Sequence, residues 1–327
     1  MKQVSNFITN IDLQEDTIYT PPHKIHPPPP RISNRQQIDD NYDNNHDSHN
    51  AKMNLLLINS IGRKENLKLA LYNKVTHFPS DSWACIAFVH ADESTLPDTN
   101  HHLQKLENPN IGNCQILRLP GTQWGHFLQF VPPALVSPSY NHVAILLDDI
   151  FLPEDGPSPI HVPTLLKHMK DYNLQSISPG VRGDHHGWMD PLGQREYQNC
   201  LMNVQAIEIY FQIFTAEGWE CFYHLMHYSG GKGWCYDVCF KNVCGASLGI
   251  DYRMVAYHTE MKEVRASIPH KAIQSTGLHF HGESKEKKGY SPEEIAINSF
   301  VCQKYDCTKP TPEEFMLDTM QCDSTKD

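Results

Sequence analysis

The chain has 327 residues, of which 38 are acidic and 27 basic, so its formal net charge is −11. This acidic balance argues against nucleic acid as the main partner, because phosphate backbones bind basic surfaces. A nucleotide remains compatible with it, since a metal ion can bridge acidic side chains and phosphate oxygens. The mean hydropathy is −0.50, and no apolar run approaches the roughly 20 residues that span a bilayer. We therefore expect no transmembrane segment in this chain.

The compartment is left open by the ten cysteines. Disulfides would fit a luminal protein, whereas reduced thiols would fit a cytosolic one. Cys235, Cys239 and Cys244 crowd one segment, but their spacing lacks the paired C-x2-C of a zinc site. The chain has no Asn-x-Ser/Thr glycosylation acceptor, and residues 1–20 lack the apolar core of a signal peptide. The expectation is the Golgi lumen if a membrane anchor precedes this chain, and the cytoplasm otherwise.

Residues 1–51 are predicted to be disordered. They contain four consecutive prolines at 27–30 and an Asn/Asp/His-rich run at 39–50 with hardly any aliphatic residue. Such a composition cannot bury enough apolar surface to offset the entropy cost of ordering the chain.

The remaining residues alternate between strand-like and helix-like patterns. Apolar runs predict strands at residues 53–60, 83–90, 114–119, 142–147, 175–179 and 249–258. Helical patterns cover residues 62–71, 123–135, 161–172, 204–214 and 219–227, and the polar C-terminal extension at 263–327 has a short helix near 292–305. This alternation predicts an α/β fold with a mostly parallel central sheet flanked by helices.

The strand at 142–147 ends in two acids, Asp148 and Asp149. In open α/β sheets, ligands bind at the carboxyl edge of the strands. Two adjacent carboxylates there suit a hard divalent ion that carries a phosphorylated substrate. The alternative is a turn that happens to be acidic.

Three further groups of polar residues could contribute to a site. Asp237 stands beside two aromatic residues, Trp234 and Tyr236, at the start of a predicted helix, so it is either a general base or an acid stabilised by the helix dipole. His258 ends the strand at 249–258 and is either structural or a metal ligand, if that strand lies beside Asp149. His185 and His186 form a polar pair after the strand at 175–179.

Several common nucleotide and hydrolase motifs are missing. The glycine-rich loop at 229–233 does not match a P-loop, and no G-x-G-x-x-G follows the first strand. No G-x-S-x-G nucleophile elbow is present.

The ordered set of segments resembles a plant and algal domain-of-unknown-function family grouped with the GT-A glycosyltransferases. Some plant members of that family are labelled "lysine ketoglutarate reductase trans-splicing related". The resemblance spans roughly residues 54–259, so residues 52–262 are expected to form a GT-A-like globular domain. It is carried by the segments 62–66, 78–81, 124–130, 142–153, 185–186, 233–237 and 251–258, together with Cys200, Trp219, Cys221 and Cys244.

The resemblance implies a metal-dependent glycosyltransferase with a nucleotide-diphospho-sugar transferase fold. It implies that Asp149 and His258 ligate a divalent metal, Mn²⁺ in the first place and Mg²⁺ as an alternative. Asp237 would be the catalytic base, and the nucleotide would be bound by Asp148, His185, His186 and Asp251. The partners would be a nucleotide sugar and a carbohydrate-type acceptor.

Two departures from the family pattern favour a second hypothesis. The acidic motif Leu-Asp-Asp-Ile lacks a third acid that relatives often have, and Gln205 replaces a family glutamate, with Glu208 three residues further on. The alternative is therefore a catalytically inactive GT-A-like protein that binds a carbohydrate or another partner.

Overall fold

A computed structural model of the chain describes residues 53–323, apart from residues 79–82, 93, 95, 98, 123–127, 185–186, 227–234, 261, 270–272, 274–277, 279–299 and 309. The segment predicted to be disordered, residues 1–51, lies outside the described residues, as do the glycine-rich loop at 229–233 and part of the predicted C-terminal helix.

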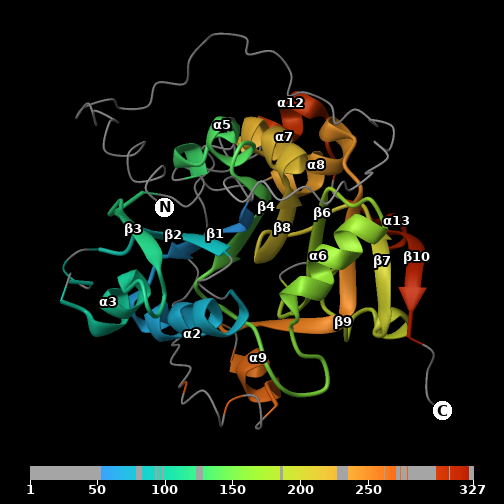
Figure 1. Cartoon of the computed structure of the whole chain (residues 1–327). Coiled ribbons are helices and arrows are strands. Elements are labelled where there is room, and N and C mark those ends of the chain that lie inside the picture. Colours follow the sequence, from blue (N-terminus) through green and yellow to red (C-terminus); the bar gives the residue numbers. More distant parts are fainter. Residues whose placement is uncertain are drawn as a thin grey trace, which may run out of the picture.

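Ten described strands form one sheet. The strands are β1 (Met53–Ile61), β2 (Trp83–Val89), β3 (Cys114–Arg118), β4 (Tyr140–Leu147), β5 (Ile150–Phe151), β6 (Ser176–Arg182), β7 (Cys200–Val204), β8 (Phe211–Thr215), β9 (Leu248–His258) and β10 (Met316–Cys322). Their order is β10-β7-β9-β6-β8-β4-β1-β2-β3, and β5 pairs with β9. Figure 1 shows β3 and β10 at opposite ends of this sheet.

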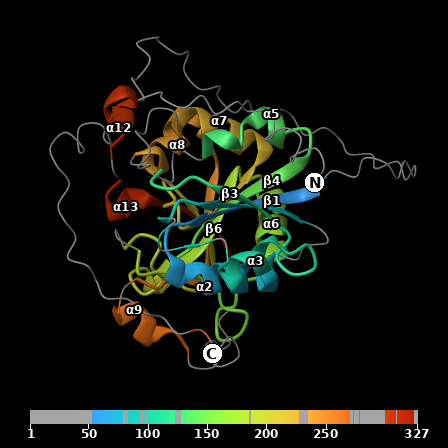
Figure 2. The ribbon, with the colours of Figure 1, turned by 90° about the vertical axis from the view of Figure 1, so that its left-hand side faces the viewer.

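Helices cover both faces of the sheet. They are α2 (Leu67–His77), α3 (His101–Glu107), α5 (Pro133–Val136), α6 (Val162–Asp171), α7 (Ala216–Met226), α8 (Tyr236–Cys244), α9 (Lys262–Ser267), α12 (Phe300–Tyr305) and α13 (Pro312–Phe315), with 3-10 turns η1 (Lys64–Asn66), η2 (Leu128–Phe130) and η3 (Arg195–Tyr197). Helices α5, α7 and α8 lie on one side of the sheet and α2 and α3 on the other (Figure 2). The expected α/β fold with flanking helices is confirmed. None of the described helices is long and apolar enough to cross a bilayer.

The sheet is mixed rather than mostly parallel. Strands β4, β1, β2 and β3 run parallel to one another, and β6 runs parallel to β9. Strand β8, however, is antiparallel to both β4 and β6, and β7 is antiparallel to both β9 and β10. The prediction of a mostly parallel sheet is therefore wrong for the second half of the chain. A buried apolar run indicates a strand but not its direction, which depends on the strands that it pairs with.

The prediction of a helix at residues 204–214 is also wrong. Residue Val204 ends β7, and residues 211–215 form β8, whose backbone pairs with β4. The segment has apolar residues at both helical and strand spacing, and the sheet offers its backbone hydrogen bonds on both sides. Tertiary pairing therefore decides the conformation here.

The predicted C-terminal extension contributes directly to the sheet. Strand β10 pairs antiparallel with β7 from Met316 to Cys322, with register shifts between Met316 and Asp318 and between Thr319 and Gln321. A disulfide between Cys200 and Cys322 joins the two strands, which are 122 residues apart in sequence at that point. The other disulfides join Cys85 to Cys114, Cys221 to Cys244, Cys235 to Cys302 and Cys239 to Cys307, so all ten cysteines are paired.

Removing the disulfide between Cys200 and Cys322 should destabilise the fold without abolishing it. In a Cys200→Ser/Cys322→Ser variant, the unfolded chain regains the freedom of a 122-residue loop, which is expected to cost roughly 2–5 kcal/mol. The measurement is the free energy of unfolding in denaturant under non-reducing conditions. The single Cys322→Ser variant serves as the control, because it breaks the same bond and should lose a similar amount. An unchanged unfolding midpoint in both variants would contradict the expectation.

Candidate functional site

The candidate site lies at the edge of the sheet where β1, β4 and β9 end. Because β1 and β4 pair in parallel, the turns that follow them start side by side. The short strand β5 then pairs antiparallel with the end of β9, so that Ile150 lies opposite His258. This pairing places His258, which is distant in sequence, next to the acidic turn at Asp148 and Asp149.

Asp148 is bound to the turn that follows β1. Its Oδ2 accepts hydrogen bonds from the backbone N–H groups of Gly62, at 2.9 Å, and Arg63, at 3.0 Å. Burial and the neighbouring charge of Asp149 raise the pKa of Asp148 to about 7, although these two N–H groups act in the opposite direction. A Cβ at Gly62 would lie 2.8 Å from Cε1 of His90, so a larger residue in this turn would require the His90 side chain to move.

Asp149, His258 and Glu260 form a cluster that could hold a metal ion. Each offers one ligand atom, and these atoms all lie within 4.8 Å of one another. The Oδ1 atom of Asp149 is buried and accepts no hydrogen bond from any residue that the structure describes. One imidazole and two carboxylates suit Mn²⁺ as well as Zn²⁺. The residues present therefore fit a divalent ion.

The contact between Asp149 and His258 favours the charged form of both. His258 Nε2 lies 3.3 Å from Asp149 Oδ2, and Nδ1 lies 3.1 Å from the carbonyl oxygen of Gly183. Burial lowers the pKa of His258, but the hydrogen bond and charge of Asp149 outweigh it, so that this pKa is raised. For Asp149, burial raises the pKa, but the hydrogen bond and charge of His258 outweigh this effect, so the pKa of Asp149 is lowered. Because Nδ1 is taken by the carbonyl oxygen, Nε2 is the ring atom that faces the cluster.

Glu260 is held from two sides. Its Oε1 forms an ion pair with Arg63 Nη1 at 2.5 Å. Arg265 Nη1 donates to the carbonyl oxygens of Thr259, at 3.1 Å, and of Glu260 itself, at 3.4 Å. The turn after β9 is thus tied both to the turn after β1 and to α9.

A second group of acids lies next to this cluster. Asp184 and Glu208 are both 8 % exposed, and their side chains are hydrogen-bonded to each other. Burial, followed by the charge and hydrogen bond of Asp184, raises the pKa of Glu208 to about 9, and the charge of Asp237 acts in the same direction. A pKa of about 9 means that the Glu208 carboxyl group keeps its proton at neutral pH.

Two contacts join the acid group to the metal-ligand cluster. The carbonyl of Gly183, one residue before Asp184, lies within hydrogen-bond distance of His258. The ring of Tyr210, which is hydrogen-bonded to Glu208, packs 5.1 Å from the ring of His258. The cluster that could hold a cation and the buried acids Asp184 and Glu208 are thus connected.

The structure brings together three of the residues that the sequence analysis selected: Asp148, Asp149 and His258. Asp237 lies half-buried in the first turn of α8, where its charge acts on Glu208. His185 and His186 lie outside the described residues. The metal and nucleotide roles of these residues stay predictions.

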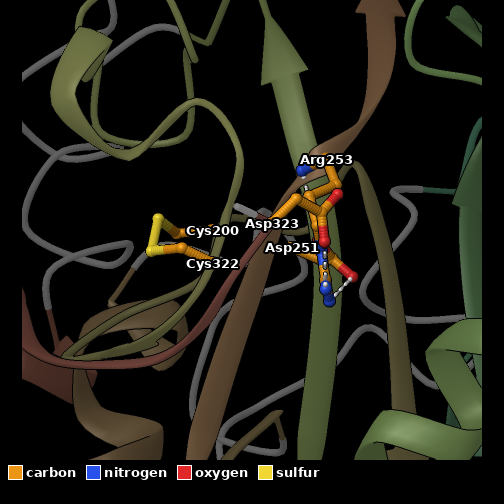
Figure 3. The surroundings of a disulfide bond; sticks show 5 residues. All are labelled: Cys200, Asp251, Arg253, Cys322 and Asp323. Atoms are coloured by element: carbon orange, nitrogen blue, oxygen red, sulfur yellow. Dashed lines mark hydrogen bonds and ion pairs between the residues drawn. A yellow bond between two sulfur atoms is a disulfide. The ribbon is translucent and has the colours of Figure 1, made fainter. Parts of the chain in front are cut away.

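Asp251 is placed elsewhere. It precedes His258 by seven residues on β9, and the pairing of β9 with β6 shifts register between the two positions. Its fully buried carboxylate binds Arg253, with Nε at 2.7 Å and Nη2 at 2.9 Å, and lies 3.0 Å from Nδ1 of His168. Figure 3 shows Asp251 and Arg253 with Asp323, close to the disulfide that precedes Asp323 in the chain. The structure does not bring Asp251 to the candidate site.

Sequence reasoning did not select Glu260 or Asp184, and it noted Glu208 only as a neighbour of Gln205. A signal for Glu260 was present, because residues two apart at the end of a strand point to the same side, and Glu260 follows His258 at that spacing. No local signal marks Glu208, since its connection to Asp184 depends on how the loop between β7 and β8 folds back.

Solved glycosyltransferase structures resemble this one at low similarity. A mannosyltransferase from Pyrobaculum calidifontis, solved with GDP-Man and Mn²⁺, aligns at 10% identity over 78% of this chain and 70% of that chain, with a TM-score of 0.44. TarS from S. aureus in complex with UDP aligns at 11% identity over 63% of this chain and 60% of that chain, with a TM-score of 0.42. TarS in complex with UDP-GlcNAc aligns at 10% identity over 77% of this chain and 71% of that chain, with a TM-score of 0.41. No protein-family model and no curated protein sequence matches the chain.

Asp251 is expected to stabilise the fold rather than to act in the site. An Asp251→Asn variant leaves Arg253 without its buried counter-charge and removes a carboxylate oxygen beside His168, which should cost about 3–5 kcal/mol of unfolding free energy. The matched control is Asp323→Asn, which removes the other partner of Arg253, a side chain that is 63% exposed, and should cost less than about 1 kcal/mol. Denaturant unfolding measures both, and equal losses in the two variants would contradict the assignment.

Glu208 should make the protein less stable as the pH rises. Its pKa is about 9 in the folded protein against an ordinary value of 4.5, so above pH 4.5 the folded state holds a proton that the unfolded chain has lost. The stability contribution of this group therefore decreases from about pH 4.5 to about pH 9. Between pH 6 and pH 9, the melting temperature of a Glu208→Gln variant should fall less than that of the wild type. The control variant is Glu217→Gln, which changes an exposed acid; its melting temperature should depend on pH as that of the wild type does. Identical pH dependences of the melting temperature in all three proteins would rule out a buried protonated Glu208.

Proposed function

We propose that this protein is a metal-dependent glycosyltransferase of the GT-A type, which transfers a sugar from a nucleotide sugar to a carbohydrate-type acceptor. The observation that carries the proposal is the cluster of Asp149, His258 and Glu260 at the carboxyl edge of the sheet. Ligand sites of open α/β sheets lie at this edge. The resemblance of the sequence to GT-A glycosyltransferases gives the ligand class.

Asp149, His258 and Glu260 would hold the divalent ion, which we take to be Mn²⁺, with Mg²⁺ as the alternative. When bound, such an ion supplies Lewis-acid stabilisation of the leaving diphosphate. Glu260 offers the third acid that the Leu-Asp-Asp-Ile motif lacks. The short motif therefore does not by itself favour an inactive protein.

Asp148 has a supporting part in this proposal. Its Oδ2 is hydrogen-bonded to two backbone N–H groups of the turn after β1, so it fixes that turn against the one that carries Asp149. Binding of the nucleotide by Asp148 itself stays part of the proposal.

Asp237 is the proposed catalytic base. A base must be ionised to accept the proton of an acceptor hydroxyl, and Glu208 keeps its own proton at neutral pH because burial raises its pKa to about 9. Glu208 is thus suited to donate a hydrogen bond and Asp237 to receive the proton. The half-buried position of Asp237 at the start of α8 is compatible with this role.

Five disulfides support folding in an oxidising compartment, because reduced thiols prevail in the cytosol. Of the two expected compartments, this observation favours the Golgi lumen over the cytoplasm.

Isothermal titration of UDP and of GDP in the presence of Mn²⁺ tests the proposal. The wild type should bind one of the two nucleotides when Mn²⁺ is present and much more weakly after chelation. Asp149→Ala should lose this metal-dependent binding, because it removes a ligand from the cluster. The control is Asp155→Ala, which removes an exposed acid six residues further on and should bind like the wild type.

The same proteins distinguish an enzyme from an inactive binding protein. If the protein is an enzyme, the wild type should slowly hydrolyse the corresponding nucleotide sugar. Asp237→Asn should reduce this rate about 100-fold or more and should still bind the nucleotide. Nucleotide binding without hydrolysis in any of the proteins would favour the binding protein, and failure of the wild type to bind either nucleotide with Mn²⁺ would overturn the proposal.

A further inference from the structure

Arg63 has a fixed backbone and an exposed side chain. Its backbone N–H donates to Asp148 Oδ2 at 3.0 Å, which ties the residue to the acidic turn. The side chain is 59% exposed, and its guanidinium reaches across to Glu260 at 2.5 Å. The guanidinium can therefore change partners while the backbone of the turn stays in place.

The partner of this guanidinium is also a candidate metal ligand. Glu260 offers a carboxylate oxygen to the same cluster as Asp149 and His258. A cation bound by a carboxylate lies about 2 Å from the ligand oxygen, so a divalent ion would stand very close to the positively charged guanidinium. The two positive charges would repel each other and compete for Glu260. Occupation of the cluster by a cation thus weakens the ion pair between Arg63 and Glu260.

We propose that Arg63 is a phosphate-binding residue whose guanidinium is released from Glu260 when the cation binds, and then contacts the diphosphate of the nucleotide sugar. This inference rests on the proposed function, since it names a further residue of the same site. A guanidinium presents its N–H groups in a planar fork that binds two phosphate oxygens at once. Arg63 is placed for this contact because it follows β1 at the edge where β4 carries Asp149.

The exchange imposes an order of binding. In the metal-free protein, Glu260 neutralises Arg63, so the guanidinium is not available to a diphosphate. After the cation has bound, the acids are neutralised and the guanidinium becomes available, so the nucleotide follows the metal. Coupling between two ligands is reciprocal, and bound nucleotide therefore raises the affinity for the cation.

The test separates the two ligands by titrating each into wild type, Arg63→Ala and Arg63→Lys. First, Mn²⁺ alone is titrated calorimetrically; second, UDP or GDP, whichever the wild type binds, is titrated at saturating Mn²⁺. Arg63→Ala should bind Mn²⁺ at least as tightly as the wild type, because the competitor for Glu260 is gone. It should bind the nucleotide about 10-fold or more weakly, because a charged hydrogen bond is lost. Arg63→Lys should recover part of the nucleotide affinity, and Lys64→Ala, which removes the adjacent exposed cation, should behave like the wild type in both titrations.

A Glu260→Gln variant supplies the complementary arm. This variant should bind Mn²⁺ more weakly than the wild type. In the absence of metal it should bind the nucleotide more tightly, because the guanidinium of Arg63 is no longer neutralised by Glu260. Adding Arg63→Ala to this variant should abolish that gain. Thermal melts of each variant check that it is folded.

The outcomes distinguish the two proposals. If the wild type binds neither nucleotide with Mn²⁺, the proposed function fails, and the role of Arg63 fails with it. If the wild type binds as proposed but Arg63→Ala weakens Mn²⁺ binding, or leaves nucleotide binding unchanged, only the role of Arg63 is overturned. Opposite effects on the two ligands are the result that a merely structural arginine would not produce.

Discussion

The site depends on the antiparallel pairing of the short strand β5 with the end of β9. Strand β5 begins directly after Asp149, and its first residue lies opposite His258. The backbone hydrogen bonds of this pairing hold two loops together that are more than 100 residues apart in sequence. Without it, the acidic turn after β4 would have no imidazole beside it and no third carboxylate within reach.

This pairing concentrates negative charge at one edge of the sheet, and the surrounding residues compensate for it. Asp148 accepts hydrogen bonds from two backbone N–H groups, Asp149 is paired with His258, and Glu260 forms an ion pair with Arg63. Each acid thus has a donor or cation of its own, yet one buried oxygen of Asp149 has no partner among the described residues. A buried carboxylate oxygen is costly to leave unsatisfied. A cation in the cluster would satisfy it, and this unsatisfied oxygen is a physical reason for proposing a binding site at this edge.

The C-terminal part of the chain supports this arrangement from a distance. Strand β10 covers the edge of the sheet beside β7, and a disulfide holds it there. Arg253 links the residue after that disulfide to the buried Asp251 of β9. Strand β9 is therefore anchored at its middle by ion pairs and at its end by β5. Such anchoring at two points restricts where His258 can lie, as the proposed role of a metal ligand would require.

The sequence by itself determined the α/β class, the position of the acidic turn at the end of a buried strand, and the candidate residues Asp149 and His258. These features depend on local patterns: apolar runs, their ends and the residues that follow them. Only the tertiary structure decided the direction of β8, the separation of Asp251 from the site, and the meeting of Glu260 with Arg63 and of Glu208 with Asp184. Each of these depends on which distant strands pair and in which register, and a strand's own residues encode only that it will be buried.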